Sequence, residues 1–169
     1  MLGIVNDDMP FLVDSVAAEI GAHGLAVARV LHPVAGVTRS AAGELEALGA
    51  RGSGQNESII YMEVERADAR VRRQIEEAIH ALLAQVRAAV ADWPALQAAL
   101  ATDASSLGVS DGGDLLRWFG DNKLTLLGHA HFGRDGSVTA PLGIARDLGA
   151  QLLSPAARKR AFDWFAKGG

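Results

Sequence analysis

The sequence predicts an α+β fold in which two helices cover one face of an antiparallel sheet, in the element order βαββαβ, with a C-terminal extension of helices and a hairpin. Two observations support this. A short apolar run at residues 2–5 precedes an amphipathic stretch at residues 12–20. Later, an alternating segment at residues 57–65 precedes a long helical pattern that begins at Asp68.

The first strand is predicted at residues 2–5, and the chain then turns at Asn6, Asp7 and Asp8. The segment from Asp8 to Pro10 is typical of a helix entrance, because an acidic residue caps free backbone N–H groups and proline tolerates the first turn. Apolar residues recur every four positions after it, which predicts a helix of about three to four turns. They are Leu12, Val16 and Ile20.

Gly24 is a suitable terminator for this helix, since glycine adopts the left-handed conformation without strain. Residues 25–38 are rich in β-branched and apolar side chains and predict a strand, bent near Pro33 because proline cannot donate to a sheet ladder. Residues 43–56 contain several glycines and predict a mobile loop. Residues 57–65 alternate and predict a half-buried strand.

The longest predicted helix begins at Asp68 and carries an apolar stripe as far as Trp93. Pro94 favours a new helix at residues 95–101. Further elements are a short helix, a strand, a hairpin turn with its return strand, and a closing helix. Their ranges are 114–119, 123–132, 133–136, 137–139 and 156–167.

This order divides the chain into three predicted parts. Residues 1–107 form a βαββα core with a long second helix. Residues 108–146 supply a short helix and a β-hairpin that completes the sheet, and residues 147–169 form a helical tail. The apolar stripe of the long helix outruns a small sheet, so we expect its later half to meet another segment or another subunit.

Composition restricts the classes of function. Apolar residues make up 49% and charged residues 21% of the 169 residues, which suits one soluble domain or a domain with an appendage. A net charge of −4 without a basic cluster argues against binding to nucleic acid or to a membrane surface. Cysteine is absent, which excludes disulfides, thiolate metal sites and cysteine nucleophiles. Without a signal peptide or an apolar run near ~20 residues, we expect a cytoplasmic location.

The turn at Asn6, Asp7 and Asp8 is the main candidate site, because it joins a strand end to a helix N-terminus. Three interpretations stay open. The leading one is capping of the helix by an aspartate, which contributes roughly 1 kcal/mol. The second is a site for an amino-acid effector, although two carboxylates would repel an anion. The third is catalysis or metal binding by the paired carboxylates.

Other chemical motifs are weak. His129 and His131 share one face of a predicted strand and need a third ligand to hold zinc, so we favour a solvated or interface role and predict no metal site. Residues 49–54 are glycine-rich but lack the spacing of a dinucleotide-binding loop. No nucleophile elbow and no P-loop occurs. We therefore predict no catalytic residue and no bound cofactor in this chain.

Residues 6–12, followed by Val16, Ile20 and Gly24, resemble the opening of ACT domains. Those domains share the ferredoxin-like βαββαβ order and commonly bind amino acids at domain interfaces. The resemblance implies an ACT-like fold and a possible effector site. The implied contacts are Asn6, Asp7, Asp8, Met9 and Phe11. Many amino-acid-binding ACT domains have glycine after the proline, whereas Phe11 stands here, which favours assembly over amino-acid binding.

A closer resemblance is to the N-terminal region of the large, mainly bacterial class of NAD-specific glutamate dehydrogenases. It covers roughly residues 2–146. The motifs that carry it are NDDMPFLVDSV (6–16), HGL (23–25), HPV (32–34), VRAAVADWPAL (86–96), LLRWFGDNKLTLLG (115–128) and Leu142-Gly143-Ile144.

That family converts L-glutamate to 2-oxoglutarate and ammonia with NAD, by residues outside this chain. The resemblance therefore implies a non-catalytic regulatory and oligomerisation domain, in contact with downstream domains of a parent enzyme that uses NAD. A homo-oligomer is expected, with an amino-acid effector as a further partner. The alternatives are an amino-acid sensor at the first strand–helix turn and, more remotely, a small stand-alone metal-dependent enzyme.

Overall fold

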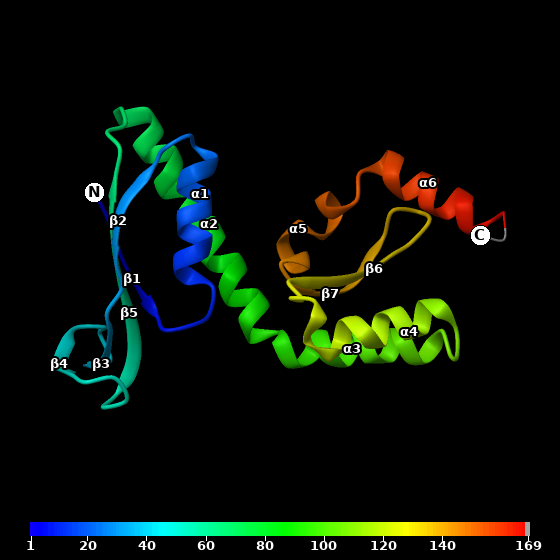
Figure 1. The fold of residues 1–169 in the computed structure, drawn as a ribbon, viewed down its shortest axis with the longest axis horizontal. Helices are drawn as coiled ribbons and strands as arrows, with labels where there is room; N and C mark the ends of the chain where they lie inside the picture. Colours follow the sequence, from blue (N-terminus) through cyan, green and yellow to red (C-terminus); the bar gives the residue numbers. More distant parts are fainter. Residues whose placement is uncertain (168–169) are drawn as a thin grey trace. The chain divides into compact units, whose positions relative to one another are not determined.

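A computed structural model describes residues 1–167 of the chain. Strands dominate the first part of the chain and helices the second (Figure 1). The elements are β1 (Leu2–Asp7), α1 (Leu12–Ala22), β2 (Val27–Leu31), β3 (Val34–Arg39), β4 (Leu45–Gly49), β5 (Gln55–Val64), α2 (Ala69–Ala91), α3 (Trp93–Ser106), α4 (Asp111–Trp118), the π-helix η1 (Phe119–Lys123), β6 (Gly128–Phe132), β7 (Val138–Gly143), α5 (Ala145–Leu152) and α6 (Pro155–Phe165).

Strand β5 is the centre of the first sheet. On one side it pairs with β1 along six positions, from Leu2 opposite Met62 to Asp7 opposite Glu57. On its other side it pairs with β2 and then with β3. All of these pairings are antiparallel, and β4 extends the sheet beyond β3.

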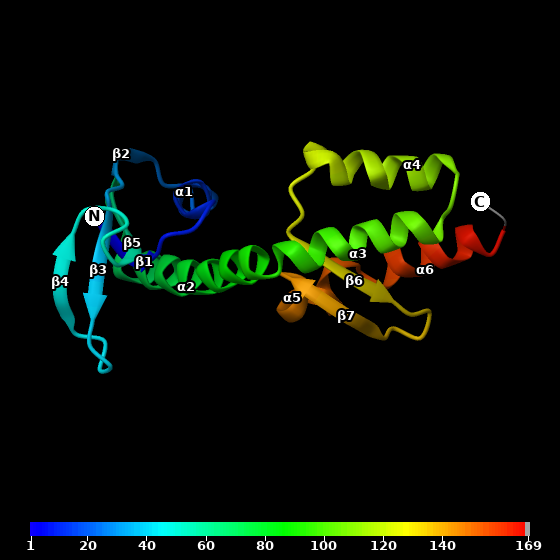
Figure 2. The ribbon, with the colours of Figure 1, turned by 90° about the horizontal axis from the view of Figure 1, so that it is seen from below.

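Two helices cover one face of this sheet, as the sequence predicts. Both α1 and the first part of α2 lie on the same side of the strands in Figures 1 and 2. Each contributes a row of buried side chains, and β5 contributes every second residue. The buried residues are Leu12, Val16 and Ile20 of α1, Ser58, Ile60 and Met62 of β5, and Ile75 and Ile79 of α2. The predicted α+β class with an antiparallel, ferredoxin-like sheet is confirmed.

The predicted bent strand at residues 25–38 is also confirmed. Strands β2 and β3 lie along the same edge of β5, and the ladder is interrupted between them at His32 and Pro33. Proline has no N–H to donate, but its carbonyl can still accept. The Ile59 N–H donates to the Pro33 carbonyl at 2.9 Å, so one hydrogen bond bridges the interruption.

The prediction of a mobile loop at residues 43–56 is wrong in part, because the segment is not all loop. This segment contains β4, which forms a hairpin with β3 and a tight return to β5. Glycine is required where these backbones meet, because a Cβ at Gly36 would lie 2.4 Å from the Ala50 carbonyl oxygen. Gly36 and Gly54 therefore permit close backbone packing, while the sequence pattern suggested flexibility.

The predicted start of the long helix is confirmed. The Asp68 carboxylate accepts hydrogen bonds from the backbone N–H groups of Arg70 and Val71, at 2.8 and 2.9 Å. The Val71 bond contributes most to lowering the pKa of Asp68. Among the described residues, no helix combines the length and apolar character that a membrane crossing requires.

The hairpin of β6 and β7 forms a two-stranded sheet of its own, so the prediction that it completes the first sheet is wrong. The hairpin packs against α3 and α5, its neighbours in sequence. Closing these local contacts costs less loop entropy than pairing with β1, which lies far earlier in the chain. The chain divides into two compact units, Met1–Ala84 and a second that begins at Gln85. The domain boundaries proposed at residues 107 and 146 stay predictions.

The two faces of β5 differ in how deeply they are buried, and paired substitutions measure this. Ile60 is buried against the helices, whereas Ile59 is half-buried on the opposite face. We expect Ile60→Ala to lower the free energy of unfolding by about 2–5 kcal/mol, because it leaves a cavity in the core. Ile59→Ala should lower it clearly less. Urea unfolding followed by circular dichroism measures both, and equal losses would contradict the assigned faces.

Candidate functional site

The end of β1 and the turn after it contain the five residues predicted as effector contacts. Strand β1 ends at Asp7, opposite Glu57 of β5, and the backbone N–H of Asp8 donates to the Asn56 carbonyl at 2.9 Å. The ladder to β5 thus continues one residue beyond the strand. This fixes the position of the turn before any side chain is considered.

Asp8 does not cap α1, so the leading interpretation of this residue is wrong. One of its carboxylate oxygens accepts a hydrogen bond from the Ser58 hydroxyl at 2.7 Å. The other lies 3.0 Å from Nη2 of Arg51. Because Ser58 is fully buried under the helices, its hydroxyl needs an acceptor, and Asp8 supplies one. The carboxylate therefore ties the turn to β5 and to the segment between β4 and β5.

Helix α1 begins without a side-chain cap. Its N-cap position is Phe11, which adopts a left-handed conformation with φ of 70°, and the Ser15 N–H donates to the Phe11 carbonyl at 3.0 Å. A bulky residue in this conformation is strained. The Phe11 ring is 48% exposed, so it neither fills the core nor shields the helix N-terminus completely.

The remaining predicted contacts are also engaged locally. Oδ1 of Asp7 accepts a hydrogen bond from the Gln55 side chain at 2.7 Å. The Asn6 side-chain amide donates to the Asp7 carbonyl at 2.8 Å. Met9 is half-buried. The five residues lie in one short turn, but whether they bind an effector stays a prediction.

Close to this turn lies a pair that sequence reasoning missed, Arg39 and Glu57. The Arg39 guanidinium donates two hydrogen bonds to the Glu57 carboxylate, at 2.6 and 2.8 Å, and so joins β3 to β5. These bonds lower the pKa of Glu57 and raise that of Arg39, while nearby Asp7 raises the Glu57 pKa. The two residues are 18 positions apart in the sequence and lie on different strands. No spacing in the sequence therefore predicts the pair.

The chemistry available to the turn follows from these contacts. Both oxygens of Asp8 are in contact with Ser58 and Arg51, and the Ser58 hydroxyl is fully buried. Among the described contacts, therefore, these side chains act on one another and stabilise the turn.

In the second compact unit, Asp92 forms another carboxylate contact. It lies between α2 and α3 and accepts two hydrogen bonds from Arg146, at 2.6 and 2.8 Å, and one from the Gly143 N–H at 2.7 Å. The Arg146 bonds, followed by the Gly143 bond, lower the pKa of Asp92 to about 2. Gly143 has φ of 57° and no space for a Cβ, which would lie 2.2 Å from the Leu127 carbonyl oxygen.

The structure also supplies a third residue beside His129 and His131. The side chain of Asp103, on α3, lies 2.7 Å from Nε2 of His129 and 3.6 Å from Nε2 of His131. The sequence offered no acidic residue at motif spacing because helix–hairpin packing creates this proximity. These contacts do not test the prediction that the chain has no metal ligand.

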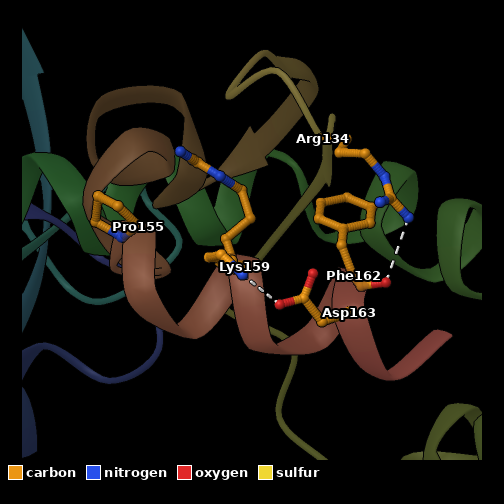
Figure 3. A pocket seen from close by; sticks show the side chains of 6 residues that line it. Arg134, Pro155, Lys159, Phe162 and Asp163 are labelled. Carbon is orange, nitrogen blue, oxygen red and sulfur yellow. Dashed lines mark hydrogen bonds and ion pairs between the residues drawn. The ribbon is translucent and has the colours of Figure 1, made fainter. Parts of the chain in front are cut away.

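A shallow pocket lies along α6 (Figure 3). The Arg134 guanidinium contacts the Phe162 ring, with its carbon 5.3 Å from the ring centroid, and donates to the Phe162 carbonyl. Lys159 pairs with Asp163 one turn along the helix. Arg134 and Lys159 are thus engaged within the pocket lining.

The residues present do not fit a dinucleotide. Such a site needs a glycine-rich turn from a strand into a helix, with the pyrophosphate at the helix N-terminus of a parallel βαβ unit. The glycine-rich segment 49–54 joins two strands, β4 and β5. The strand pairs formed within residues 1–167 are antiparallel.

Comparison with known proteins agrees with the motifs in the sequence. Residues 1–79 match the family described as "Glutamate dehydrogenase, ACT1 domain". The chain is 33% identical over 144 residues to the NAD-specific glutamate dehydrogenase of Pseudomonas aeruginosa, in an alignment that covers 76% of the chain. It spans 9% of that relative's length. The resemblance inferred from the sequence is confirmed at this level.

The Asp92 contacts predict an acid-dependent component of stability. The pKa of Asp92 is depressed from 3.8 to about 2, so its contribution is fully present above about pH 4 and is lost as the pH falls towards 2. Asp92→Asn should reduce stability by about 1–2 kcal/mol at pH 7, and should flatten the dependence of stability on pH below 4. Urea midpoints between pH 2 and 7 measure this. Exposed Asp111→Asn is the control, and an unchanged acid profile in the Asp92 variant would exclude the assigned role.

Proposed function

We propose, from the premise that residues 1–79 belong to the ACT1 domain family of glutamate dehydrogenases, that this chain is a non-catalytic regulatory and assembly module. Its parent would be an NAD-specific glutamate dehydrogenase, which converts L-glutamate to 2-oxoglutarate and ammonia. The catalytic residues and the NAD site would lie in downstream domains of that enzyme. The supporting observation is an exposed apolar face on the first sheet.

This outer face, opposite the helices, consists of Val5, Leu31, Ile59 and Tyr61. Val5 lies opposite Ile59 and Leu31 lies opposite Tyr61, so the four side chains share one side of three neighbouring strands. Val5 is 59% and Leu31 55% exposed, while the β5 residues are half-buried. A sheet that faces water usually alternates apolar and polar residues, whereas these four apolar side chains adjoin one another, with the Arg29–Glu63 ion pair beside them on the same face. An exposed apolar cluster of this kind favours association.

The edge of the sheet supports the same proposal. Strand β1 pairs with β5 on one side only, so within the described residues its outer edge carries no partner strand. Edge strands of monomeric proteins usually carry lysine, proline or a bulge, which block pairing with another chain. Residues Leu2–Asp7 contain neither lysine nor proline and pair with β5 without a register shift. The edge is therefore suited to extension by another module.

Engagement of the acidic turn favours an assembly role over a catalytic one. Asp8 contacts Ser58 and Arg51, and Asp7 contacts Gln55, so the carboxylates that chemistry would need stabilise the fold. A module that associates through its sheet can transmit changes in the neighbouring subunit to its own turn. Regulation would then act through the stability of the assembly.

Charged substitutions on the outer face test this proposal. We expect the double variant Val5→Glu with Leu31→Glu to lose self-association, because both side chains are exposed and paired carboxylates cannot be buried without a large desolvation penalty. The fold should persist, with little change in melting temperature. Sedimentation velocity over a concentration series measures association.

The matched control is Val109→Glu, since Val109 is 100% exposed and belongs to the second compact unit. This variant should associate like the unsubstituted chain. A strict monomer at every concentration of the unsubstituted chain would refute self-assembly. Undiminished association of the double variant would remove the outer face from the proposal.

A second function, sensing of an amino acid at the same turn, has one favourable observation. The N-cap residue of α1, Phe11, supplies no side-chain cap, and a helix N-terminus favours a carboxylate ligand. Asn6, Asp7, Asp8, Met9 and Phe11 are the proposed contacts. An amino acid that binds here should release heat in calorimetric titration, and Phe11→Gly should strengthen binding, because glycine at this place lets the backbone approach the ligand closely. Absence of heat across a panel of amino acids, with an unchanged melting temperature, would refute this function.

A further inference from the structure

The cluster of Asp103, His129 and His131 arises from the packing of α3 on the β6–β7 hairpin. His129 and His131 are two residues apart on β6, so their side chains leave the same face of the strand. Strand β7 has one extra residue opposite them, between Thr139 and Leu142, and Ala140 in that bulge has φ of 48°. Asp103 lies on α3 and projects its carboxylate towards both rings.

The spacing of the three side chains suits one small cation. Their ligand atoms lie within 4.8 Å of one another, and the two nitrogen–oxygen separations are 2.7 and 3.6 Å. Ligand atoms around a tetrahedral zinc ion, each about 2.0–2.2 Å from the metal, are roughly 3.3 Å apart. The two separations lie on either side of that value. Small side-chain rotations would lengthen the shorter separation and shorten the longer one.

We propose that Asp103, His129 and His131 bind one divalent transition-metal ion of the zinc class. The ligands would be the Nε2 atoms of both histidines and a carboxylate oxygen. Imidazole nitrogen with a carboxylate selects zinc and its neighbours over Mg²⁺ and Ca²⁺, which prefer an all-oxygen shell. The site lies outside the family match at residues 1–79 and is independent of the proposed assembly function.

Hydrogen bonding alone does not account for the position of His131 in the cluster. The distance of 3.6 Å from His131 to Asp103 is long for a hydrogen bond, although the ring is held edge-on to His129 with centroids 5.0 Å apart. A shared cation would use the Nε2 of both rings.

The surroundings predict how strongly the metal is held. Metal-binding histidines usually donate their second ring N–H to an acceptor, and loss of that acceptor weakens binding about 10–100-fold. Nδ1 of His129 is buried and has no hydrogen-bond partner among the described residues. The site should therefore bind zinc more weakly than one with a complete outer shell. His131 is 59% exposed, so water can take the fourth position.

Titration of the chain with Zn²⁺, in competition with a chromophoric chelator, tests this site. We expect one zinc ion per chain. Co²⁺ should give visible absorption bands of a low-symmetry site with nitrogen and oxygen ligands. His131→Ala and Asp103→Asn should each weaken zinc binding by more than about 100-fold, since loss of a direct ligand exceeds loss of an outer-shell partner.

His80→Ala is the matched control, because His80 is an exposed histidine on α2 outside the cluster. Zinc should raise the melting temperature of the unsubstituted chain and of this control, and should leave that of His131→Ala unchanged. Because His131 is exposed, its substitution should preserve the fold, which circular dichroism verifies. Absence of stoichiometric binding, or equal binding by His131→Ala and the unsubstituted chain, would overturn the proposal.

Discussion

The first sheet depends on the two-residue alternation of β5. Because successive side chains point to opposite faces, Ser58, Ile60 and Met62 must lie on the helix side when Ile59 and Tyr61 lie on the other. A shift of one residue would reverse every one of these positions. The same constraint that buries the core therefore exposes a second apolar face. Assembly would follow directly from the apolar residues that β5 carries on its two faces.

Carboxylates in this chain stabilise its structure in several places. Asp8 satisfies the hydroxyl of a buried serine, Glu57 joins two strands through Arg39, and Asp92 binds Arg146 where α2 meets α3. In each case a short polar contact joins segments that are distant in the sequence. Asp8, an acidic residue of the candidate turn, thus contributes to the fold.

Periodicity predicted those parts of the fold that local sequence determines. The helix of Leu12, Val16 and Ile20, the alternating strand at residues 57–65 and the start of α2 at Asp68 all occur as expected. Strand β4 was missed because the glycines around it suggested flexibility, whereas Gly36 on β3 and Gly54 before β5 serve close backbone packing, which local sequence cannot distinguish from flexibility. The hairpin was assigned to the wrong sheet because its partners depend on long-range packing.

In the candidate sites too, local sequence predicted some features, while others depend on long-range packing. The sequence located the turn at residues 6–11. It could not predict the contacts of Asp8 with Ser58 and Arg51, because those residues are distant from Asp8 in the sequence. Likewise, two histidines were recognised without the aspartate beside them. Contacts of this kind arise from sheet register and helix packing, and no spacing in the sequence encodes them.

A reconstruction of the whole parent enzyme by electron cryomicroscopy tests the central claim most directly. If the outer face mediates assembly, Val5 and Leu31 become buried against a sheet or helix of another subunit. Both side chains facing solvent in the assembled enzyme would contradict an assembly role for this module.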